Sequence, residues 1–277
     1  MDYLDPIDYT ASGFSDYFDE LPLWSAPFAM MLLDRVPVRR GLTILDVGAG
    51  TGFLTLELAE RCGADSRVIA VDPWHDAMRR LRLKLAQRQL TNVSIYEQDA
   101  ATLDLPEATV DVVVSNLGVN NFDEPARVLG ACFRLAKPGA ILLLTTNPVG
   151  HMAEFYAVIR AVLIEMGREC CLPALDAHIN HRGTVDSVAS LIQAAGFELA
   201  DVATSSFRLR FADGSALLRH YFIRLGFVQG WKSVIKPEDA PAIFARLEAR
   251  LNSLARDEGE LALTIPMACL MGRKPLA

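Results

Sequence analysis

Short runs of β-branched and aliphatic residues alternate with amphipathic stretches in the first half of this chain, and this alternation restricts the possible folds more than any other feature. The runs lie at 43–47, 68–71, 93–96, 110–115 and 140–145, and the amphipathic stretches at 52–61, 76–90 and 125–135. Strands that alternate with helices are typical of βα units in a parallel sheet. We therefore expect an α/β fold, in which a Lys-Pro-Gly turn at 137–139 introduces the fifth strand.

The segments before and after this region differ from it in character. Residues 1 to about 40 are rich in aromatic side chains and predict a helical cap. Beyond residue 147, helices are expected at 153–167, 185–195, 214–228 and 238–257, and strands at 197–211 and 261–272. We expect a single α/β domain with a cap at 1–40, a ligand-binding core at 41–147 and a remainder at 148–277 whose helical insertions cover the substrate.

The composition excludes several classes of protein. With 277 residues, 51% of them hydrophobic, the chain can bury a large core. It has no apolar run near the roughly 20 residues that cross a bilayer, and its acidic start is unlike a signal peptide, so we expect a cytoplasmic protein without a membrane span. A net charge of −7 disfavours a nucleic-acid partner, and five cysteines without a CxxC pair indicate packing.

The stretch ILDVGAGTGFL places Gly48, Gly50 and Gly52 directly after the first strand. A turn from a strand into a helix presents free N–H groups and the positive end of a helix dipole, and glycines let a ligand approach closely. The dinucleotide-binding pattern needs a glycine at its sixth position, where this chain has Phe53. The phosphate-binding Walker loop is excluded as well, because no Lys-Ser or Lys-Thr pair follows.

Four motifs resemble those of the class I S-adenosylmethionine-dependent methyltransferases, of the type 11 group that acts on small molecules. They are Asp46-x-Gly-x-Gly-x-Gly, the strand VIAV ending at Asp72, YEQDAATLDLP with Asp99, and VDVVVSN followed by RLAKPGAILLLTTN. The resemblance covers about 41–147. It implies a Rossmann-like, mostly parallel seven-stranded sheet with an antiparallel last strand, and S-adenosylmethionine as the cofactor.

The resemblance also assigns roles to individual residues. Asp72 would accept the ribose diol, Asp99 the adenine amino group, and the Ala100 N–H would meet a ring nitrogen. The amino-acid tail would lie at the glycine turn beside Asp46 and Asn116. The implied cofactor-binding set is Asp46, Gly48, Ala49, Gly50, Gly52, Asp72, Pro73, Trp74, Asp99, Ala100 and Asn116. Two alternatives stay open: strand-end acids often cap the next helix, and Asp46 can serve the loop backbone alone.

Methyl transfer is an in-line displacement in which positioning and exclusion of water can supply most of the catalysis. A base is optional, and His151 after the fifth strand is our candidate. His178 and His181 lack a third ligand nearby, so no metal site is expected. His220 is expected to be a packed residue of the C-terminal helices.

We therefore expect methyl transfer from S-adenosylmethionine to an oxygen, nitrogen or carbon atom of a small-molecule acceptor. The motifs of exocyclic-amine and cytosine nucleic-acid methyltransferases are missing, which favours a small molecule. A non-catalytic cofactor-binding sensor or partner subunit, and transfer of another group from the cofactor, are the alternatives. The oligomeric state is open, with a homodimer as one possibility.

Overall fold

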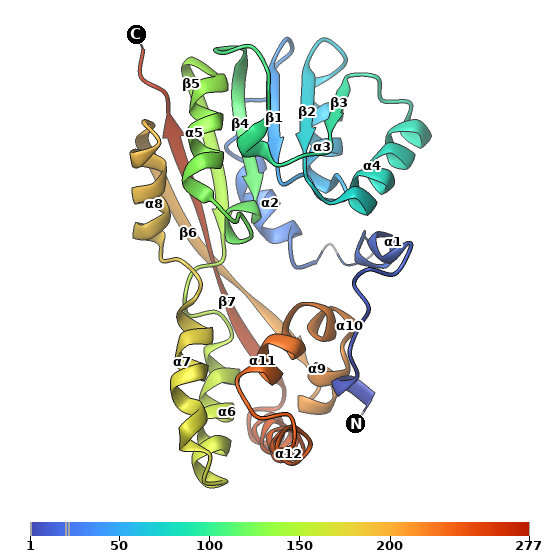
Figure 1. Ribbon diagram of the computed structural model, residues 1–277, viewed down its shortest axis with the longest axis vertical. Coiled ribbons are helices and arrows are strands. Elements are labelled where there is room, and N and C mark those ends of the chain that lie inside the picture. The colour runs from blue at the N-terminus through green and yellow to red at the C-terminus, as the bar shows by residue number, and fades with distance from the viewer. Residues whose placement is uncertain (1, 20, 22, 277) are drawn as a thin grey trace. The chain divides into compact units, whose positions relative to one another are not determined.

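The computed structural model describes residues 2–19, 21 and 23–276, and it contains a seven-stranded sheet (Figure 1). The strand order is β3-β2-β1-β4-β5-β7-β6. The strands are β1 (Thr43–Val47), β2 (Arg67–Val71), β3 (Val93–Tyr96), β4 (Val110–Asn116), β5 (Ala136–Thr146), β6 (Glu198–Phe211) and β7 (Leu261–Arg273). Strands β1 to β5 pair in parallel, and β7 is antiparallel to β5, so the predicted α/β class and the antiparallel last strand are confirmed.

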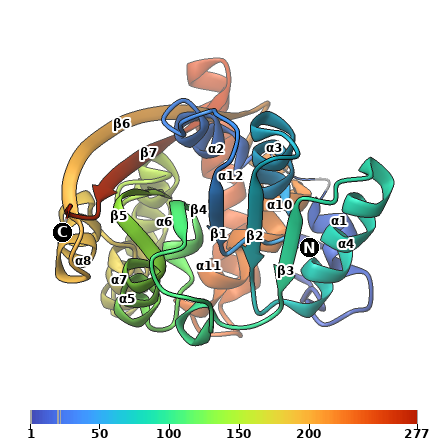
Figure 2. The same ribbon diagram turned by 90° about the horizontal axis from the view of Figure 1, so that it is seen from above.

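Successive residues of β1 contribute to different hydrophobic clusters, as expected for a strand buried on both faces. Leu45 joins the cluster that contains residues of α5 (Pro125–Leu135) and α8 (Val185–Ala194). Ile44 joins the cluster built with α2 (Ala26–Leu33) and α3 (Phe53–Cys62). Figure 2 shows α3 and α5 on opposite sides of the sheet. The helices of both faces thus hold the strand ends, and the loops that follow them, in fixed positions.

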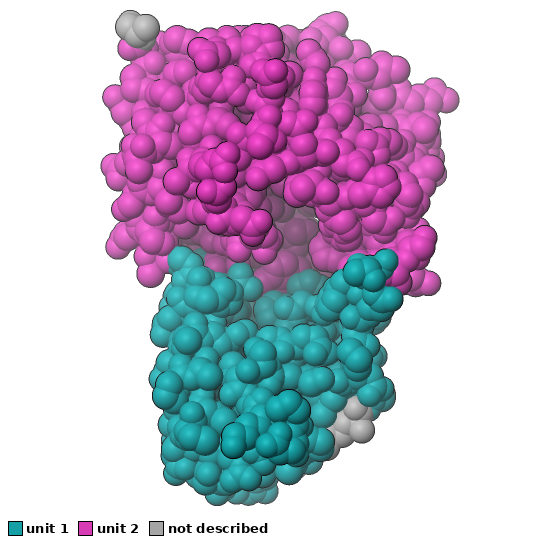
Figure 3. All heavy atoms as spheres, in the orientation of Figure 1, with its two compact units in different colours: residues 1–10, 148–183, 206–266 teal, residues 11–147, 184–205, 267–277 magenta. Residues whose placement is uncertain are grey.

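The chain divides into two compact units, coloured separately in Figure 3. Unit 2 consists of residues 11–147, 184–205 and 267–277, and unit 1 of residues 1–10, 148–183 and 206–266. The predicted boundary at 147 coincides with a unit boundary, whereas the predicted cap at 1–40 is divided between the units. Strands β6 and β7 each begin in one unit and end in the other.

The remaining helices follow this division. Unit 2 also holds α1 (Phe14–Asp19), α4 (His75–Arg88), and the short 3-10 helices η2 (Ala100–Thr102) and η3 (Gly118–Asn120). Unit 1 holds η1 (Asp2–Leu4), α6 (Ala153–Glu165), η4 (Glu169–Cys171), α7 (Leu172–Asn180), α9 (Gly214–Arg219), α10 (Tyr221–Ile223), the π-helical turn η5 (Arg224–Val228), α11 (Gln229–Ser233) and α12 (Ala240–Glu258).

Unit 1 has an aromatic core of its own. The rings of Phe155 in α6 and Trp231 in α11 stack with their centroids 3.8 Å apart, and both side chains are buried. Phe244 of α12 is buried as well. Phe227 and Trp231 therefore contribute to this core, and the role of the helical insertions toward a substrate stays a prediction.

The Lys-Pro-Gly segment differs from the expected turn before the fifth strand. Strand β5 begins at Ala136, and the register to β4 changes between Val110 opposite Ala136 and Val112 opposite Ile141. The segment is therefore an irregularity inside a longer strand. Its Gly139 has φ +78° and donates its amide to the Lys274 carbonyl over 3.0 Å. This partner is far away in the sequence, so the turn motif gave no sign of the pairing.

Candidate functional site

The three glycines after β1 have positive φ angles, and each has a different neighbourhood. A Cβ atom on Gly52 (φ +88°) would lie 2.2 Å from Leu81 Cδ1 of α4, and one on Gly48 (φ +75°) would lie 3.3 Å from the Gly118 Cα. A Cβ on Gly50 (φ +54°) would meet nothing within 4 Å. Packing within the protein therefore opposes a side chain strongly at Gly52 and more weakly at Gly48. The space beside Gly50 is open for a ligand.

Asp72 links the glycine loop to the end of β2. Its Oδ2 accepts a hydrogen bond from the Gly50 amide at 2.9 Å, and its Oδ1 accepts one from the Trp74 amide at 2.8 Å. Burial raises the pKa of Asp72, although these two hydrogen bonds oppose the shift. Because each carboxylate oxygen has further lone pairs, both can still accept hydrogen bonds from a ligand diol.

Asp46 lies under the loop rather than at its surface. It is 1% exposed, and its Oδ2 accepts a hydrogen bond from the Thr55 hydroxyl of α3 at 2.6 Å. Burial, together with the Asp72 carboxylate, raises the pKa of Asp46 to about 7, and the Thr55 hydrogen bond acts against this rise. Asp46 thus connects the end of β1 to the first turn of α3 and carries a carboxyl group that titrates near neutrality.

Asp99 and Ala100 follow β3. The Asp99 side chain is exposed and accepts a hydrogen bond from the Ala101 amide at 2.8 Å, which caps η2. The capping role considered as an alternative for strand-end acids is therefore present at Asp99. Ala100 is 8% exposed at the start of the same turn.

Asn116 at the end of β4 is held by two neighbours. Its side-chain amide donates to the Ser25 carbonyl at 3.2 Å, and its Oδ1 accepts from the Thr145 hydroxyl at 2.7 Å. Thr145 is buried in β5 and also accepts a hydrogen bond from the Leu117 amide at 3.0 Å, where Leu117 has the left-handed φ of +65°. Thr145 orients this strand end, and sequence reasoning missed it because its partners lie at the end of β4 and directly after it.

Helix α1 packs beside Trp74, which lies in the segment between β2 and α4. The Phe14 and Phe18 rings lie 6.2 Å and 5.3 Å from the Trp74 ring, the second in an edge-to-face arrangement. The Ser15 amide donates to Asp76 Oδ2 of α4 at 2.9 Å. This part of the predicted cap is therefore attached to the core next to the end of β2.

Ion pairs between acidic residues of α1 and basic residues of α4 also attach α1 to the core. In α1, Asp16 pairs with Arg79 at 3.1 Å, and Asp19 pairs with Arg80 at 2.9 Å. Asp19 also has a hydrogen bond with Thr51 of the glycine loop. The acidic residues at 16 and 19 and the basic residues of the helix at 75–88 were visible in the sequence, but their pairing depends on the fold.

The predicted cofactor residues thus come together after β1, β2, β3 and β4, four strands that are adjacent in the sheet, all within unit 2. A family model described as a methyltransferase domain, Methyltransf_11, matches residues 45–144. The ubiquinone/menaquinone biosynthesis C-methyltransferase UbiE from Idiomarina loihiensis is 30% identical over 182 residues, which cover 61% of this chain and 71% of that protein. The chain belongs to the class I S-adenosylmethionine-dependent methyltransferases. It is an enzyme of this family, and S-adenosylmethionine is its cofactor.

Two further comparisons extend beyond the cofactor-binding region of this methyltransferase. Nocamycin O-methyltransferase from Saccharothrix syringae is 28% identical over 257 residues, which cover 89% of this chain and 90% of that protein. The crystal structure of the YcgJ protein from Bacillus subtilis is similar with a TM-score of 0.61, at 12% identity, over 91% of this chain and all (100%) of that one. The second likeness shows a shared fold.

The histidines of this methyltransferase all lie outside the cofactor loops except His75. His151 follows β5 in unit 1 and is 2% exposed, and burial, followed by the charge of Arg182, lowers the pKa of His151 to about 3. His181 Nδ1 contacts the His178 carbonyl oxygen at 2.6 Å. His220 was expected to be a packed residue but is exposed, although its ring lies edge-on to the Phe211 ring with centroids 5.4 Å apart.

The described part of the chain contains neither a metal-binding group nor a helix that could span a membrane. No three His, Cys, Asp or Glu side chains among residues 2–19, 21 and 23–276 are grouped in a way that could hold a metal ion. None of the helices within these residues combines the length and the apolar character that crossing a membrane requires.

Proposed function

We propose that this methyltransferase transfers the methyl group to an oxygen atom of a small molecule. The observation that carries the proposal is the extent of the two sequence comparisons. The relative named as an O-methyltransferase aligns with 89% of this chain, whereas the one named as a C-methyltransferase aligns with 61%. A match of 89% necessarily includes a large part of the sequence outside 45–144, where residues specific to an acceptor are expected.

We also propose roles for the residues that hold the cofactor, and the contacts around the loops support them. Asp72, whose carboxylate is oriented by two backbone amides, would accept the ribose hydroxyls. The open space beside Gly50 would admit the amino-acid tail, and buried Asp46 would face its ammonium group. Trp74, held by α1, would form a wall beside the adenine. The base role that the sequence suggested for His151 stays an untested prediction, and the burial of this residue argues against it.

When bound, S-adenosylmethionine supplies a methyl group on a positively charged sulfur. The chain's own contribution is to orient the cofactor with hydrogen-bonding groups on rigid strand ends and to exclude water. A base with a pKa near 3, as burial gives His151 in this structure, would remove a proton from a neutral hydroxyl poorly at neutral pH. An acceptor that is already acidic is therefore the class that this chain suits best.

The experiment that tests oxygen as the acceptor uses S-adenosylmethionine with a ¹³C-labelled methyl group and a panel of phenols, enols, amines and carbon acids. The ¹³C chemical shift of the product distinguishes a methyl on oxygen from one on nitrogen or carbon. We expect label on oxygen only. Label on carbon or nitrogen would contradict the proposal, and so would formation of S-adenosylhomocysteine without any methylated product.

A further inference from the structure

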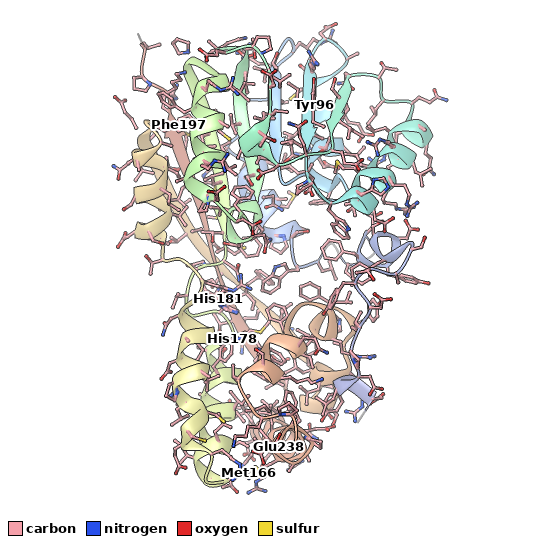
Figure 4. All side chains as sticks on the ribbon, in the orientation of Figure 1. Tyr96, Met166, His178, His181, Phe197 and Glu238 are labelled. Carbon is pink, nitrogen blue, oxygen red and sulfur yellow. The ribbon has the colours of Figure 1, made fainter. Side chains whose placement is uncertain are left out.

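Unit 1 contains a group of polar side chains among aromatic rings, which we call the His151 cluster: His151, Tyr156, His178, Arg182 and Trp231. The Trp231 Nε1–H donates to the Tyr156 hydroxyl at 3.3 Å, and this hydroxyl is also 3.3 Å from His178 Nε2. The His151 ring packs edge-on against the Tyr156 ring with centroids 5.6 Å apart. Figure 4 labels His178 and His181, which lie at the same end of α7.

The imidazole of His151 is the unusual member of this cluster. It is 2% exposed, and its Nδ1 has no hydrogen-bond partner among the residues that the structure describes. A buried polar atom without a partner costs roughly 1 to 3 kcal/mol, so such atoms are rare in folded proteins. The ring of Phe227, 6.3 Å from the imidazole ring, offers no compensating hydrogen bond. Nδ1 therefore has a hydrogen-bonding capacity that the described residues do not use and that a ligand would satisfy.

The charged groups that act on the His151 imidazole all have the same, positive sign. Among the described residues, the groups whose charges act on His151 are Arg182, His181 and His178, and all three act against a positive imidazole. His151 is therefore neutral at physiological pH, and its N–H can donate a hydrogen bond without adding a charge. Burial also lowers the pKa of Arg182, so this cation is in an environment where an anionic partner would be favourable.

The surrounding rings suit an aromatic or conjugated ligand. Trp231 and Phe155 stack at 3.8 Å, and Phe227 lies next to Trp231 with centroids 5.8 Å apart. Aromatic walls bind a flat molecule through its apolar faces, and a few polar groups fix its orientation. A flat molecule that carries one acidic oxygen combines both requirements.

We propose that the His151 cluster binds the acidic hydroxyl of the methyl acceptor in its ionised form, as a phenolate or enolate, with a neutral His151 donating a hydrogen bond and Arg182 supplying the positive charge. This inference rests on the proposed transfer to oxygen and names the acceptor class. The acceptor loses its proton to solvent before it binds. Its oxygen therefore already carries the electron pair that would form the new O–C bond, while the bond between the methyl carbon and the cofactor sulfur would break and S-adenosylhomocysteine would leave. His151 acts as a binding residue that transfers no proton.

The test measures binding and does not require turnover. The probe is 4-nitrophenol, whose ionisation is visible by absorbance, and nitrobenzene is the matched compound without the hydroxyl. Both are titrated into the protein with S-adenosylhomocysteine present. We expect the phenolate to bind at least about tenfold more tightly than nitrobenzene, which corresponds to about 1.4 kcal/mol. We also expect the pKa of the bound phenol to be lower than in solution.

Variants test whether the His151 cluster causes the preference for the phenolate over nitrobenzene. Arg182→Gln and His151→Phe should both reduce the preference for the phenolate about tenfold or more. Arg182→Lys should keep most of it, and His151→Asn, which places an amide near the position of Nδ1, should keep part of it. Arg250→Gln is the control, since Arg250 is an exposed residue of unit 1 that pairs with Glu165. It should bind both compounds like the parent protein.

Three results would overturn the proposal: no measurable binding of the phenolate to the parent protein, equal affinity for the phenolate and nitrobenzene, or an unchanged preference in both Arg182→Gln and His151→Phe. A failure of the proposed phenolate binding can be distinguished from a failure of the proposed methyl transfer to oxygen. The ¹³C experiment reports the methylated atom whether or not the acceptor is bound as an anion by this cluster.

Discussion

The three glycines of the loop after β1 share a left-handed backbone, yet the surroundings of Gly50 and Gly52 predict different consequences of substitution. Left-handed backbone costs a non-glycine residue roughly 1 to 2 kcal/mol. At Gly52 the added Cβ would also overlap Leu81 Cδ1, whereas at Gly50 it would enter open space. A substitution of Gly52 should therefore mainly weaken folding, whereas a substitution of Gly50 should mainly weaken ligand binding.

We predict that Gly52→Ala lowers the free energy of unfolding clearly more than Gly50→Ala, because only the first adds a steric overlap to backbone strain. Gly50→Ala should fold but bind S-adenosylhomocysteine at least about tenfold more weakly, a loss of about 1.4 kcal/mol. Urea unfolding and calorimetry measure the two effects. Gly41→Ala, with φ +76° and nothing within 4 Å of its added Cβ, is the control for strain alone. Equal cofactor affinity in Gly41→Ala and Gly50→Ala would refute a ligand beside Gly50.

The raised pKa of Asp46 predicts a pH dependence of cofactor binding. A cationic ammonium group stabilises the ionised carboxylate, so binding should strengthen as the pH rises through about 7 and weaken below it. Calorimetry across this range measures the slope. Asp46→Asn should bind with a flatter profile. If the parent and Asp46→Asn show the same slope, Asp46 serves only the loop and α3.

At the scale of residues, the sequence indicated which side chains stand at strand ends, because acids after β-branched runs are visible without a structure. It did not indicate their partners. The Thr145 hydroxyl reaches Asn116 from a neighbouring strand, and Gly118 is needed because a Cβ there would lie 2.4 Å from Ser115 Oγ. Such contacts depend on strand order and register, which a single sequence does not contain.

At the scale of elements, the attachment of α1 to α4 depends strongly on Asp76. The hydrogen bond from Arg79, followed by those from Ser15, lowers the pKa of Asp76 to about 2. In an unfolded chain the value is about 3.9. The stabilising contribution is therefore fully present above about pH 4 and is lost as the pH falls through about 2.

We predict that Asp76→Ala releases α1 from the core. Amide exchange in residues 14–19 should become faster, while exchange in β1 and β4 changes little, and hydrogen exchange read by mass spectrometry shows both. In the parent protein, S-adenosylhomocysteine should slow exchange in the same residues, since α1 contacts Trp74 and the glycine loop. Asp65→Ala is the control, because Asp65 forms an exposed pair with Arg40. Equal protection of residues 14–19 with and without ligand would mean that α1 is a fixed part of the core.

The boundaries of the elements show where sequence patterns are informative. Strands β1 and β3 begin and end where the β-branched runs do, and α5 spans the predicted residues, because each is bounded by local turn signals. Strand β5 was predicted too short, since its first residue, Ala136, pairs with Val110 of β4 and Gly139 pairs with Lys274 near the other end of the chain. The hydrophobic pattern also gave no sign that β6 and β7 continue from one unit into the other.

For the whole molecule, we predict that ligand binding stabilises folding in a way that distinguishes S-adenosylhomocysteine from NAD. S-adenosylhomocysteine at about 100 times its Kd should add about 2.7 kcal/mol to the free energy of unfolding, and NAD should add nothing measurable. Thermal unfolding monitored by circular dichroism tests this. Asp72→Ala should bind about 1.5 to 3 kcal/mol more weakly, the range for hydrogen bonds to charged groups. Stabilisation by NAD, or an unchanged affinity in Asp72→Ala, would contradict the assigned site.

Some expectations for the whole molecule stay predictions. They are the cytoplasmic location, the homodimer, the absence of a nucleic-acid partner, and the use of the cap and the C-terminal helices as covers for cofactor and substrate. None of them follows from the strand order or from the family, because relatives with one fold can differ in acceptor and assembly.

Each of the two units is built from three separate stretches of the chain. This limits which segments can be exchanged between relatives in order to change the preferred acceptor. Cuts after residues 205 and 266 fall inside β6 and β7, so a chimera joined there must preserve the strand register on both sides of each splice. The stretch 148–183 begins and ends outside strands. It can therefore be exchanged between relatives as one segment. This segment contains His151, Tyr156, His178 and Arg182, and its exchange leaves every strand of the recipient intact.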